Sequence, residues 1–205
     1  MPVAPKPTLA DLIDEAEVDA LSRCHGRGTV EREAVTVEMY PKEFADWRDA
    51  VMVKRNRRGE VVLVLQRPDG QVLLHTKAFY PRGTFRLLTG GIHYGEPVLE
   101  AAVREAAEET GLAITPDRYL GLVAYDLRHG ARRLPFASYL VLAQVDGQPP
   151  VLQDTDEEIT EFRYTPVVHL PQIAADLRGL PGKWACWGAM RAPAHEMVAR
   201  LLADG

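Results

Sequence analysis

The sequence predicts an α+β or α/β fold, because segments with the pattern of strands and segments with the pattern of helices both occur along its 205 residues. Residues 61–65 are an unbroken apolar run, which is typical of a strand buried on both faces. Residues 119–127 and 134–145 predict a hairpin with its turn near His129 and Gly130. Residues 97–110 predict a helix that opens with proline and ends at Gly111.

The N-terminal part predicts a proline-rich tail over residues 1–7 and an amphipathic helix over 8–24. The alternation of Val35, Val37 and Met39 with polar residues indicates a strand, and residues 42–49 indicate a short helix. No long linker follows. We therefore expect residues 1–49 to form an N-terminal extension of one domain that covers residues 50–205.

The remaining elements follow from short apolar runs and turn signals. Further strands are expected at residues 51–54, 72–75, 85–88 and 159–164, and a turn at 68–70. Residues 54–58 are expected to be a solvated hairpin tip. The C-terminal part predicts helices over residues 169–177 and 184–202, the second broken at Pro193 because proline removes a helical hydrogen bond.

Composition limits the classes of function. Lys and Arg total 24 and Asp and Glu total 29, a net charge of −5 that argues against binding to long nucleic acids. Cys24 and Cys186 give no metal-binding spacing and no disulfide framework. The N-terminus has no signal-peptide pattern, and no apolar run approaches the roughly 20 residues that span a bilayer. We expect a cytoplasmic protein that does not act at a membrane.

The predicted helix at 97–110 concentrates carboxylates. Glu105, Glu108 and Glu109 lie at positions i, i+3 and i+4, which places them within roughly 100° of arc on one side of a helix. Such close carboxylates have raised pKa values unless a cation compensates, and their hard oxygen donors suit Mg²⁺ or Mn²⁺. A helix of this composition is also common as a solvated acidic surface. The sequence pattern around the helix therefore has to distinguish a metal site from such a surface.

That pattern covers residues 90–112. It fits Gly-x5-Glu-x7-Arg-Glu-U-x-Glu-Glu-x-Gly-U, in which U is usually a bulky aliphatic residue. A chance match is on the order of one in 10⁸ per position. The pattern resembles the box of the Nudix hydrolase family. Its positions here are Gly90, Glu96, Arg104, Glu105, Ala106, Glu108, Glu109, Gly111 and Leu112. Ala106 is smaller than usual, and Thr89 stands where members often have proline.

The resemblance implies a Nudix-like α/β/α sandwich with a mixed sheet, and hydrolysis of a nucleoside diphosphate linked to another moiety. It implies Glu105 and Glu109 as ligands of Mg²⁺ or Mn²⁺, and Glu108 as a ligand or a catalytic base. Glu96 and Arg104 would orient those ligands. The glycines Gly90 and Gly91 would let the backbone approach the metal or the phosphates closely.

Other candidates stand outside the box. Arg67, Lys77 and Arg86 precede it and could meet substrate phosphates, although a surface role is about as well supported. In some Nudix enzymes the general base lies on a distant loop, and the acidic stretch 154–158 offers Glu157 or Glu158 for that role. Phe79 and Tyr80 could stack on a base, although packing within the fold is the more common role of such rings.

Two readings of the function remain open. The first is a metal-dependent nucleotide diphosphatase acting on a small nucleotide-type substrate. ADP-ribose, nucleotide sugars, dinucleoside polyphosphates and nucleoside triphosphates all stay open as substrates. The second is a non-catalytic Nudix-fold module that senses a nucleotide. Such modules tend to lose box carboxylates, and here all are present. By analogy with larger family members, the N-terminal extension leaves a homodimer open.

Overall fold

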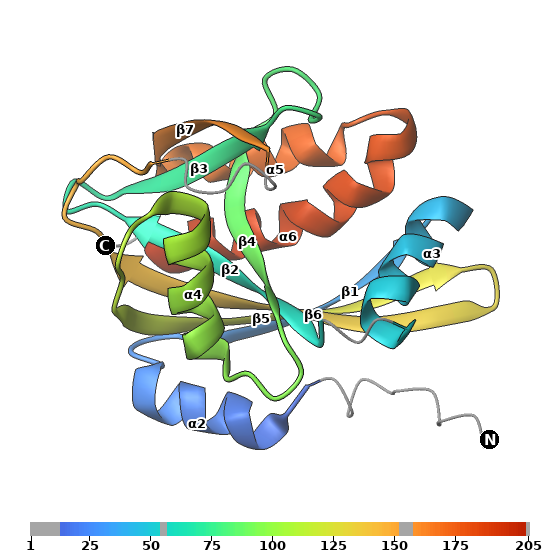
Figure 1. Cartoon of the computed structure of the whole chain (residues 1–205), viewed down its shortest axis with the longest axis horizontal. Helices are drawn as coiled ribbons and strands as arrows, with labels where there is room; N and C mark the ends of the chain where they lie inside the picture. The colour runs from blue at the N-terminus through green and yellow to red at the C-terminus, as the bar shows by residue number, and fades with distance from the viewer. Residues whose placement is uncertain (1–12, 54–56, 152–157, 204–205) are drawn as a thin grey trace.

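The computed structural model describes residues 13–53, 57–151 and 158–203. In these ranges seven strands form one mixed sheet in the order β1-β5-β6-β2-β4-β3-β7, with helices on both sides (Figure 1). The strands are β1 (Glu31–Glu38), β2 (Gly59–Gln66), β3 (Gln71–Lys77), β4 (Arg86–Ile92), β5 (Pro116–His129), β6 (Arg132–Gln144) and β7 (Ile159–Pro166). The pairs β1–β5 and β2–β6 are parallel and the other pairs antiparallel. The predicted mixed sheet between helices is confirmed.

The helices divide between the two faces of the sheet. They are α2 (Glu15–His25), α3 (Pro41–Arg48), α4 (Val98–Thr110), α5 (Leu170–Arg178) and α6 (Ala185–Leu202), with a π-helical turn η1 (Asp49–Val53) and 3-10 turns η2 (Val167–His169) and η3 (Gly182–Trp184). Helices α2 and α4 pack on one face, and α3, η1, α5 and α6 pack on the other. Each face therefore has its own apolar core.

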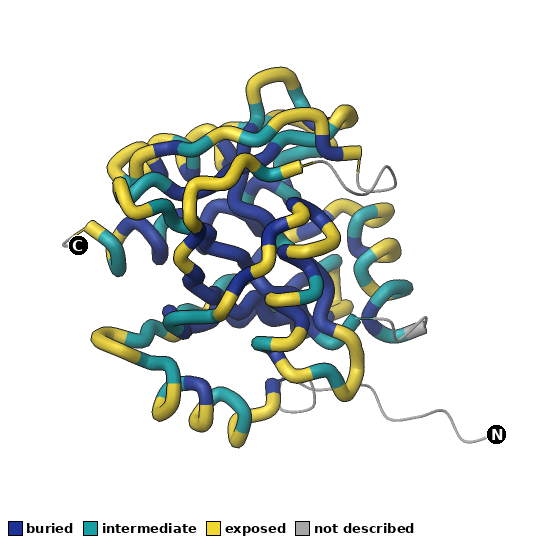
Figure 2. Tube along the Cα trace, turned by 60° about the vertical axis from the view of Figure 1, so that its left-hand side comes forward, coloured by how far each residue is buried: buried dark blue, intermediate teal, exposed yellow. Residues whose placement is uncertain are grey.

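Strand β2 is the centre of both cores. Val61, Leu63 and Leu65 face the α4 side, whereas Val62 and Val64 face the α6 side, as the alternation of a strand requires. All five side chains are at most 1% exposed. Buried residues accordingly fill the centre of the molecule, and exposed residues lie on the outer turns and helices (Figure 2). The prediction of a strand buried on both faces is confirmed.

Two predicted elements are wrong. Residues 51–53 belong to the π-helical turn η1 rather than to a strand, because a short apolar run does not distinguish a buried helical segment from a buried strand. Helix α6 continues through Pro193 instead of breaking there. The Tyr125 hydroxyl donates to the carbonyl oxygen of Met190 at 2.7 Å. Pro193 removes the helical hydrogen bond to the carbonyl oxygen of Ala189, and the Tyr125 contact lies at the next residue, Met190.

The segment expected to be an N-terminal extension contributes to the sheet. Its strand β1 pairs in parallel with β5 over eight residues, from Glu31↔Gly121 to Glu38↔Arg128. The tail over residues 1–7 and residues 8–12 of the expected helix lie outside the described ranges. Across the described residues, no helix is both long and apolar enough to cross a membrane.

Candidate active site

Helix α4 carries the carboxylates of the box and packs on the same face of the sheet as α2. Its apolar side packs on the sheet through residues that are all fully buried: Val98, Ala101, Ala102 and Ala106. Gly111 ends the helix with φ 70°, a left-handed conformation that favours glycine. Pro97 is the N-cap rather than the first helical residue, and it offers no side-chain cap. The carboxylate of Glu17 in α2 accepts the Val98 N–H at 2.8 Å instead.

Arg104 is the centre of the site. Its Nε and Nη2 donate to the two carboxylate oxygens of Glu96 at 2.8 and 2.9 Å. Its Nη1 donates to Glu105 at 2.8 Å and to Glu108 at 3.0 Å. Its Nη2 also reaches the carbonyl oxygen of Gly91 at 2.7 Å. One guanidinium thus joins three carboxylates of the helix and its preceding loop to the end of β4.

The electrostatics of this network follow from the same contacts. The hydrogen bonds from Arg104 lower the pKa of Glu96, whereas partial burial opposes this effect. The His93 N–H, which donates to Glu96 at 2.8 Å, lowers that pKa further. The hydrogen bond to Glu96 is the main reason why the pKa of Arg104 is raised. Within the protein itself, Arg104 is therefore a cation that compensates the clustered carboxylates.

The three carboxylates differ in exposure. Glu105 and Glu109 are buried, with 9% and 3% of their surface exposed, whereas 53% of the Glu108 side chain is exposed. Positions i and i+4 place Glu105 and Glu109 on the same side of α4. Within the described ranges, no group of three or more Asp, Glu, His or Cys residues is gathered to hold a metal.

The donor chemistry of Glu105 and Glu109 nevertheless fits Mg²⁺ or Mn²⁺. Magnesium is usually held by one or two carboxylates, and waters and substrate phosphates supply its remaining ligands. A pair of carboxylates on the buried edge of a helix supplies that number of protein ligands. Glu108, held on Arg104 at 3.0 Å, is the adjacent carboxylate that could join them.

The two glycines of the box lie in β4 and make room for side chains of the protein. A Cβ on Gly90 would lie 2.0 Å from Cγ and Cδ of Glu105, so the glycine lets that carboxylate lie against the strand. A Cβ on Gly91 would lie 2.9 Å from Nε of Arg57. The space beside both glycines is thus already used by Glu105 and Arg57.

Two residues that support the site were missed by the sequence analysis. Arg58, expected in a solvated hairpin tip, has only 12% of its side chain exposed. It pairs with Glu17 at 2.7 Å and donates to the carbonyl oxygen of Glu96 at 2.8 Å. Glu17 thereby contacts both Arg58 and the start of α4. Only the contact between α2 and the box reveals this role, because the partners are 41 and 81 residues apart.

The three basic residues expected to meet phosphates are not gathered at the box. Arg67 lies beyond the end of β2, about 23 Å along the strand from Glu60, the residue opposite Gly91. It pairs with Asp69 at 3.2 Å. Lys77 lies half-buried at the end of β3. Arg86 starts β4 and is 3% exposed, and it donates to protein acceptors, among them the Tyr80 hydroxyl at 2.8 Å.

Of the acidic stretch 154–158, the structure describes Glu158. Glu157 lies outside the described residues, whereas Glu158 is exposed with φ 53°. The Val151 N–H donates to the carbonyl oxygen of Thr110 at 2.8 Å, and the Ala78 N–H donates to that of Glu158 at 2.9 Å. Val151, three residues before the stretch, is therefore bonded to the last residue of α4, and Glu158, the last residue of the stretch, is bonded to the turn after β3.

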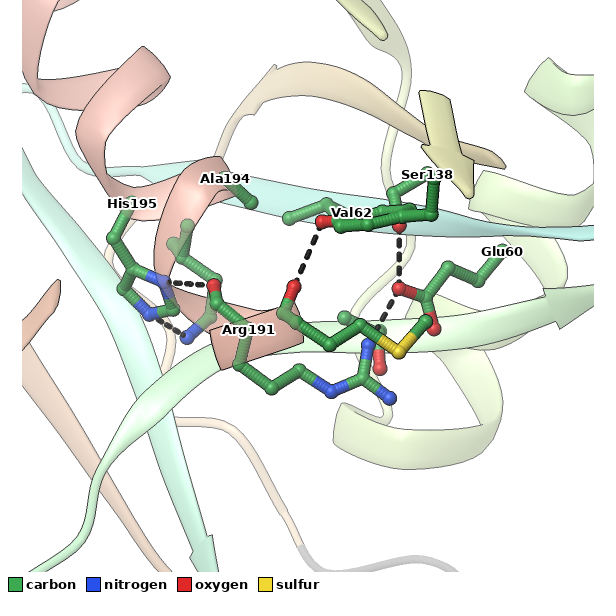
Figure 3. Close-up of a pocket in the computed structure, with 10 residues that line it drawn as sticks. Glu60, Val62, Ser138, Arg191, Ala194 and His195 are labelled. Atoms are coloured by element: carbon green, nitrogen blue, oxygen red, sulfur yellow. Dashed lines mark hydrogen bonds and ion pairs between the residues drawn. The ribbon is translucent and has the colours of Figure 1, made fainter. Parts of the chain in front are cut away.

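A second cluster of polar residues lies on the opposite face of the sheet, beneath α6 (Figure 3). Arg191 of α6 donates to Glu60 of β2 at 2.5 Å, and the Ser138 hydroxyl donates to the same oxygen at 2.6 Å. Burial raises the pKa of Glu60, but the ion pair with Arg191 and the hydrogen bonds from Arg191 and Ser138 together outweigh this effect and lower the pKa. The adjoining cavity of about 10 Å³ has room for about one water centre. Glu60, Ser138 and Arg191 are each at most 7% exposed, so this cluster has little access to solvent.

Comparison with known proteins identifies the family. The model of the NUDIX domain matches residues 31–186, and the chain therefore belongs to the Nudix family. Among solved structures, the ORF135 protein of E. coli has a TM-score of 0.51 at 18% identity, covering 71% of this chain and 91% of that one. The MutT protein of Methanosarcina mazei Go1 has a TM-score of 0.47 at 16% identity, covering 84% and 98%. A C. elegans Ap4A hydrolase has a TM-score of 0.46 at 21% identity, covering 72% and 98%. These identities indicate a shared fold alone.

Proposed function

We propose that the protein is a metal-dependent hydrolase that cleaves the diphosphate bond of a nucleoside diphosphate linked to another moiety. The observation that carries this proposal is the Arg104 network, in which one guanidinium holds Glu96, Glu105 and Glu108 beside the Gly91 carbonyl. Every charged position of the box is present and, in this geometry, bonded within the box or buried at its edge.

Each residue has a proposed role. Glu105 and Glu109 hold Mg²⁺ or Mn²⁺ on the buried edge of α4. Arg104 and Glu96 keep Glu105 in place, which is the usual function of residues that hydrogen-bond to metal ligands. The bound ion offsets the negative charge of the phosphoryl oxygens and lowers the pKa of a water. Because Arg104 binds several acceptors at once, it can release Glu108 without leaving the box.

The base that receives the proton of the attacking water is one of two groups. Glu108 is the exposed carboxylate nearest the proposed ligands in sequence. Glu157 or Glu158 of the acidic stretch is the other choice, because Val151, three residues before that stretch, donates its N–H to the carbonyl oxygen of Thr110, the residue after Glu109. Loss of turnover in Glu108→Gln, with turnover kept in both Glu157→Gln and Glu158→Gln, would assign the base to α4.

The test is turnover with Mg²⁺ on ADP-ribose, a nucleotide sugar, a dinucleoside polyphosphate and nucleoside triphosphates, with the products identified. We expect at least one substrate to release a nucleoside monophosphate or pyrophosphate. Glu109→Gln should lower turnover by at least about 100-fold, because it removes the charge that holds the ion. Glu100→Gln is the matched control, since Glu100 is exposed on the same helix outside the box pattern.

A nucleotide-sensing module without catalysis is the second candidate. It would bind nucleotides with Mg²⁺ or Mn²⁺ and turn over none of the panel. That combined result would overturn the proposed hydrolase and establish the sensing function.

A further inference from the structure

Two ion pairs of helix α2 differ in what they contact. Glu15 accepts both hydrogen bonds of the Arg32 guanidinium at 2.8 Å, and both side chains are about half-exposed. Glu17, two residues further along, pairs with Arg58 at 2.7 Å, and only 18% and 12% of these two side chains are exposed. A carboxylate withdrawn from water is costly unless its oxygens have partners. The partners of Glu17 therefore identify its role.

Both carboxylate oxygens of Glu17 bind groups at the start of the box helix. Its Oε1 accepts the Val98 N–H at 2.8 Å, and its Oε2 accepts Nη2 of Arg58 at 2.7 Å. Val98 is the first residue of α4, and its N-cap, Pro97, makes no side-chain capping bond. The first N–H groups of a helix have no partner within it, and negative charge is favourable at that end. Glu17 therefore caps α4 from another helix.

Arg58 binds both ends of the loop between β4 and α4, residues 93–97, which we call the box loop. Its backbone N–H donates to the carbonyl oxygen of Ile92, the last residue of β4, at 2.8 Å. Its Nη2 donates to the carbonyl oxygen of Glu96 at 2.8 Å, and the same Nη2 binds Glu17. This pair therefore fixes the box loop and the first turn of α4 relative to the sheet.

The box loop and the first turn of α4 determine where the proposed metal ligands lie. Glu96 of the loop binds Arg104 with both carboxylate oxygens, and Arg104 binds Glu105 at 2.8 Å. Val98 lies seven residues before Glu105, about 10 Å along the same helix. A displacement of about 1 Å by a distant change can lower the rate of a reaction about 100-fold. The support at the start of α4 therefore acts on the metal ligands.

Helix α2 is itself fixed on the sheet. Asp14 caps it and accepts the N–H groups of Ala16 and Glu17 at 3.0 and 3.1 Å. Leu21, one turn beyond Glu17, is 6% exposed and belongs to the apolar core on the α4 face, and Val18 packs against that core. The backbone of Glu17 is therefore held at its capping bond and by the packing of the turn that follows.

We propose that Glu17 and Arg58 are positioning residues, which hold the box loop and the start of α4 so that the carboxylates of α4 bind the metal. This inference rests on the proposed metal-dependent function. It extends the site to α2, which precedes the residues 31–186 matched by the NUDIX domain.

The coupling acts in both directions. If the contact of Glu17 with Val98 strengthens ion binding by a given factor, the bound ion stabilises that contact by the same factor. Docking of the N-terminal helix and binding of the ion are therefore linked. Exchange of the Val98 amide hydrogen reports the contact without any need for turnover.

The experiment measures the affinity of the full-length protein for Mn²⁺ by calorimetry. Glu17→Ala removes both contacts and should weaken Mn²⁺ binding by about 10-fold, as for other residues that support metal ligands. Glu15→Ala is the matched control, because it removes the same charge from the same turn of α2 but breaks only the exposed pair with Arg32. We expect it to bind Mn²⁺ as the wild type does.

Arg58 gives an independent test with a conservative variant. Arg58→Met should weaken Mn²⁺ binding about as much as Glu17→Ala. Arg58→Lys should bind Mn²⁺ more tightly than Arg58→Met, because both side-chain contacts of Arg58 come from one nitrogen, which the lysine ammonium can replace. Equal losses in the two variants would contradict the part assigned to Arg58.

Two further readouts separate positioning from a purely structural role. Glu17→Ala should need about 10-fold more Mg²⁺ than the wild type for half-maximal turnover. Arg191→Met, which affects the opposite face, should keep the wild-type requirement per folded molecule. Saturating Mg²⁺ should slow exchange of the Val98 amide in the wild type by about the factor lost in Glu17→Ala, and by less in that variant.

Several results would overturn the positioning role. They are a Glu17→Ala variant that binds Mn²⁺ as tightly as the wild type, and an equal loss in Glu15→Ala, which would assign the effect to charge alone. A wild type that binds no Mn²⁺ would overturn this role together with the metal site. A wild type that binds Mn²⁺ but turns over no nucleotide would refute the hydrolase alone, because the affinities still test the positioning.

Discussion

The two faces of the sheet each carry an arginine bound to glutamates, and the two differ in access to solvent. On the α4 face, 26% of the Arg104 side chain is exposed and it contacts three carboxylates. On the α6 face, 8% of the Arg191 side chain is exposed, and among the residues that the structure describes it forms an ion pair with a single carboxylate, that of Glu60, which is 1% exposed. The first network can exchange a carboxylate for a ligand, whereas the second cannot do so without opening the core.

This contrast separates a network suited to chemistry from one suited to holding the fold together. A buried ion pair is costly to break, because the remaining charge is left in an apolar environment. A partly exposed arginine with several acceptors loses less when one acceptor leaves, since water and the other acceptors remain. We therefore expect changes at Arg191 to affect stability first and changes at Arg104 to affect turnover first.

The largest expected effect is that of Arg191→Met on stability. Removing one partner of a buried pair costs about 3–5 kcal/mol, because Glu60 is left charged and buried. Urea unfolding measures the loss. Arg200→Met is the control on the same helix, because its pairs with Glu31 and Glu33 are exposed and worth about 0–1 kcal/mol. Equal losses in the two variants would show that the α6 face is not sealed.

A second prediction concerns pH and the same face. Burial lowers the pKa of His195 from 6.5 to about 4. In the unfolded chain His195 therefore binds a proton below about pH 6.5, whereas in the folded protein it binds one only below about pH 4. The free energy of unfolding should fall as the pH is lowered through this window, by about 3 kcal/mol from this group. Unfolding measured between pH 7 and pH 4 should show a shallower slope in His195→Gln. An unchanged slope would contradict the neutral buried imidazole.

Sequence patterns revealed the α4 network and missed the α6 network for a physical reason. Arg104, Glu105, Glu108 and Glu109 are neighbours on one helix, so their proximity follows from helical spacing. Glu60 and Arg191 are 131 residues apart, and only the pairing of sheet and helix brings them together.

The fold shows the same limit. The buried pattern of β2 was readable because its apolar run is long and continuous, whereas residues 51–53 were too few to distinguish a π-helical turn from a strand. Helix α6 continues through Pro193, and the nearby carbonyl oxygen of Met190 accepts a hydrogen bond from Tyr125 in β5, 65 residues away in the sequence. Contacts between distant segments decide such cases.

Arg104→Lys is expected to have the smallest effect on stability but a clear effect on turnover. Lysine keeps the charge but cannot bind Glu96 with two parallel hydrogen bonds while also reaching Glu105. Turnover should fall about 10- to 100-fold, as for other residues that orient metal ligands. The free energy of unfolding should change by about 1 kcal/mol or less. A large loss of stability with unchanged turnover per folded molecule would reverse the comparison of the two faces.

The most direct test of the α4 face as the metal site is calorimetry with Mn²⁺. We predict that the wild-type protein and the Glu100→Gln control bind the ion with the same affinity. The double variant Glu105→Gln/Glu109→Gln should bind it more weakly by about 10-fold or more. Binding by the double variant as tight as that of the wild type would contradict the assignment of these two carboxylates as the metal ligands.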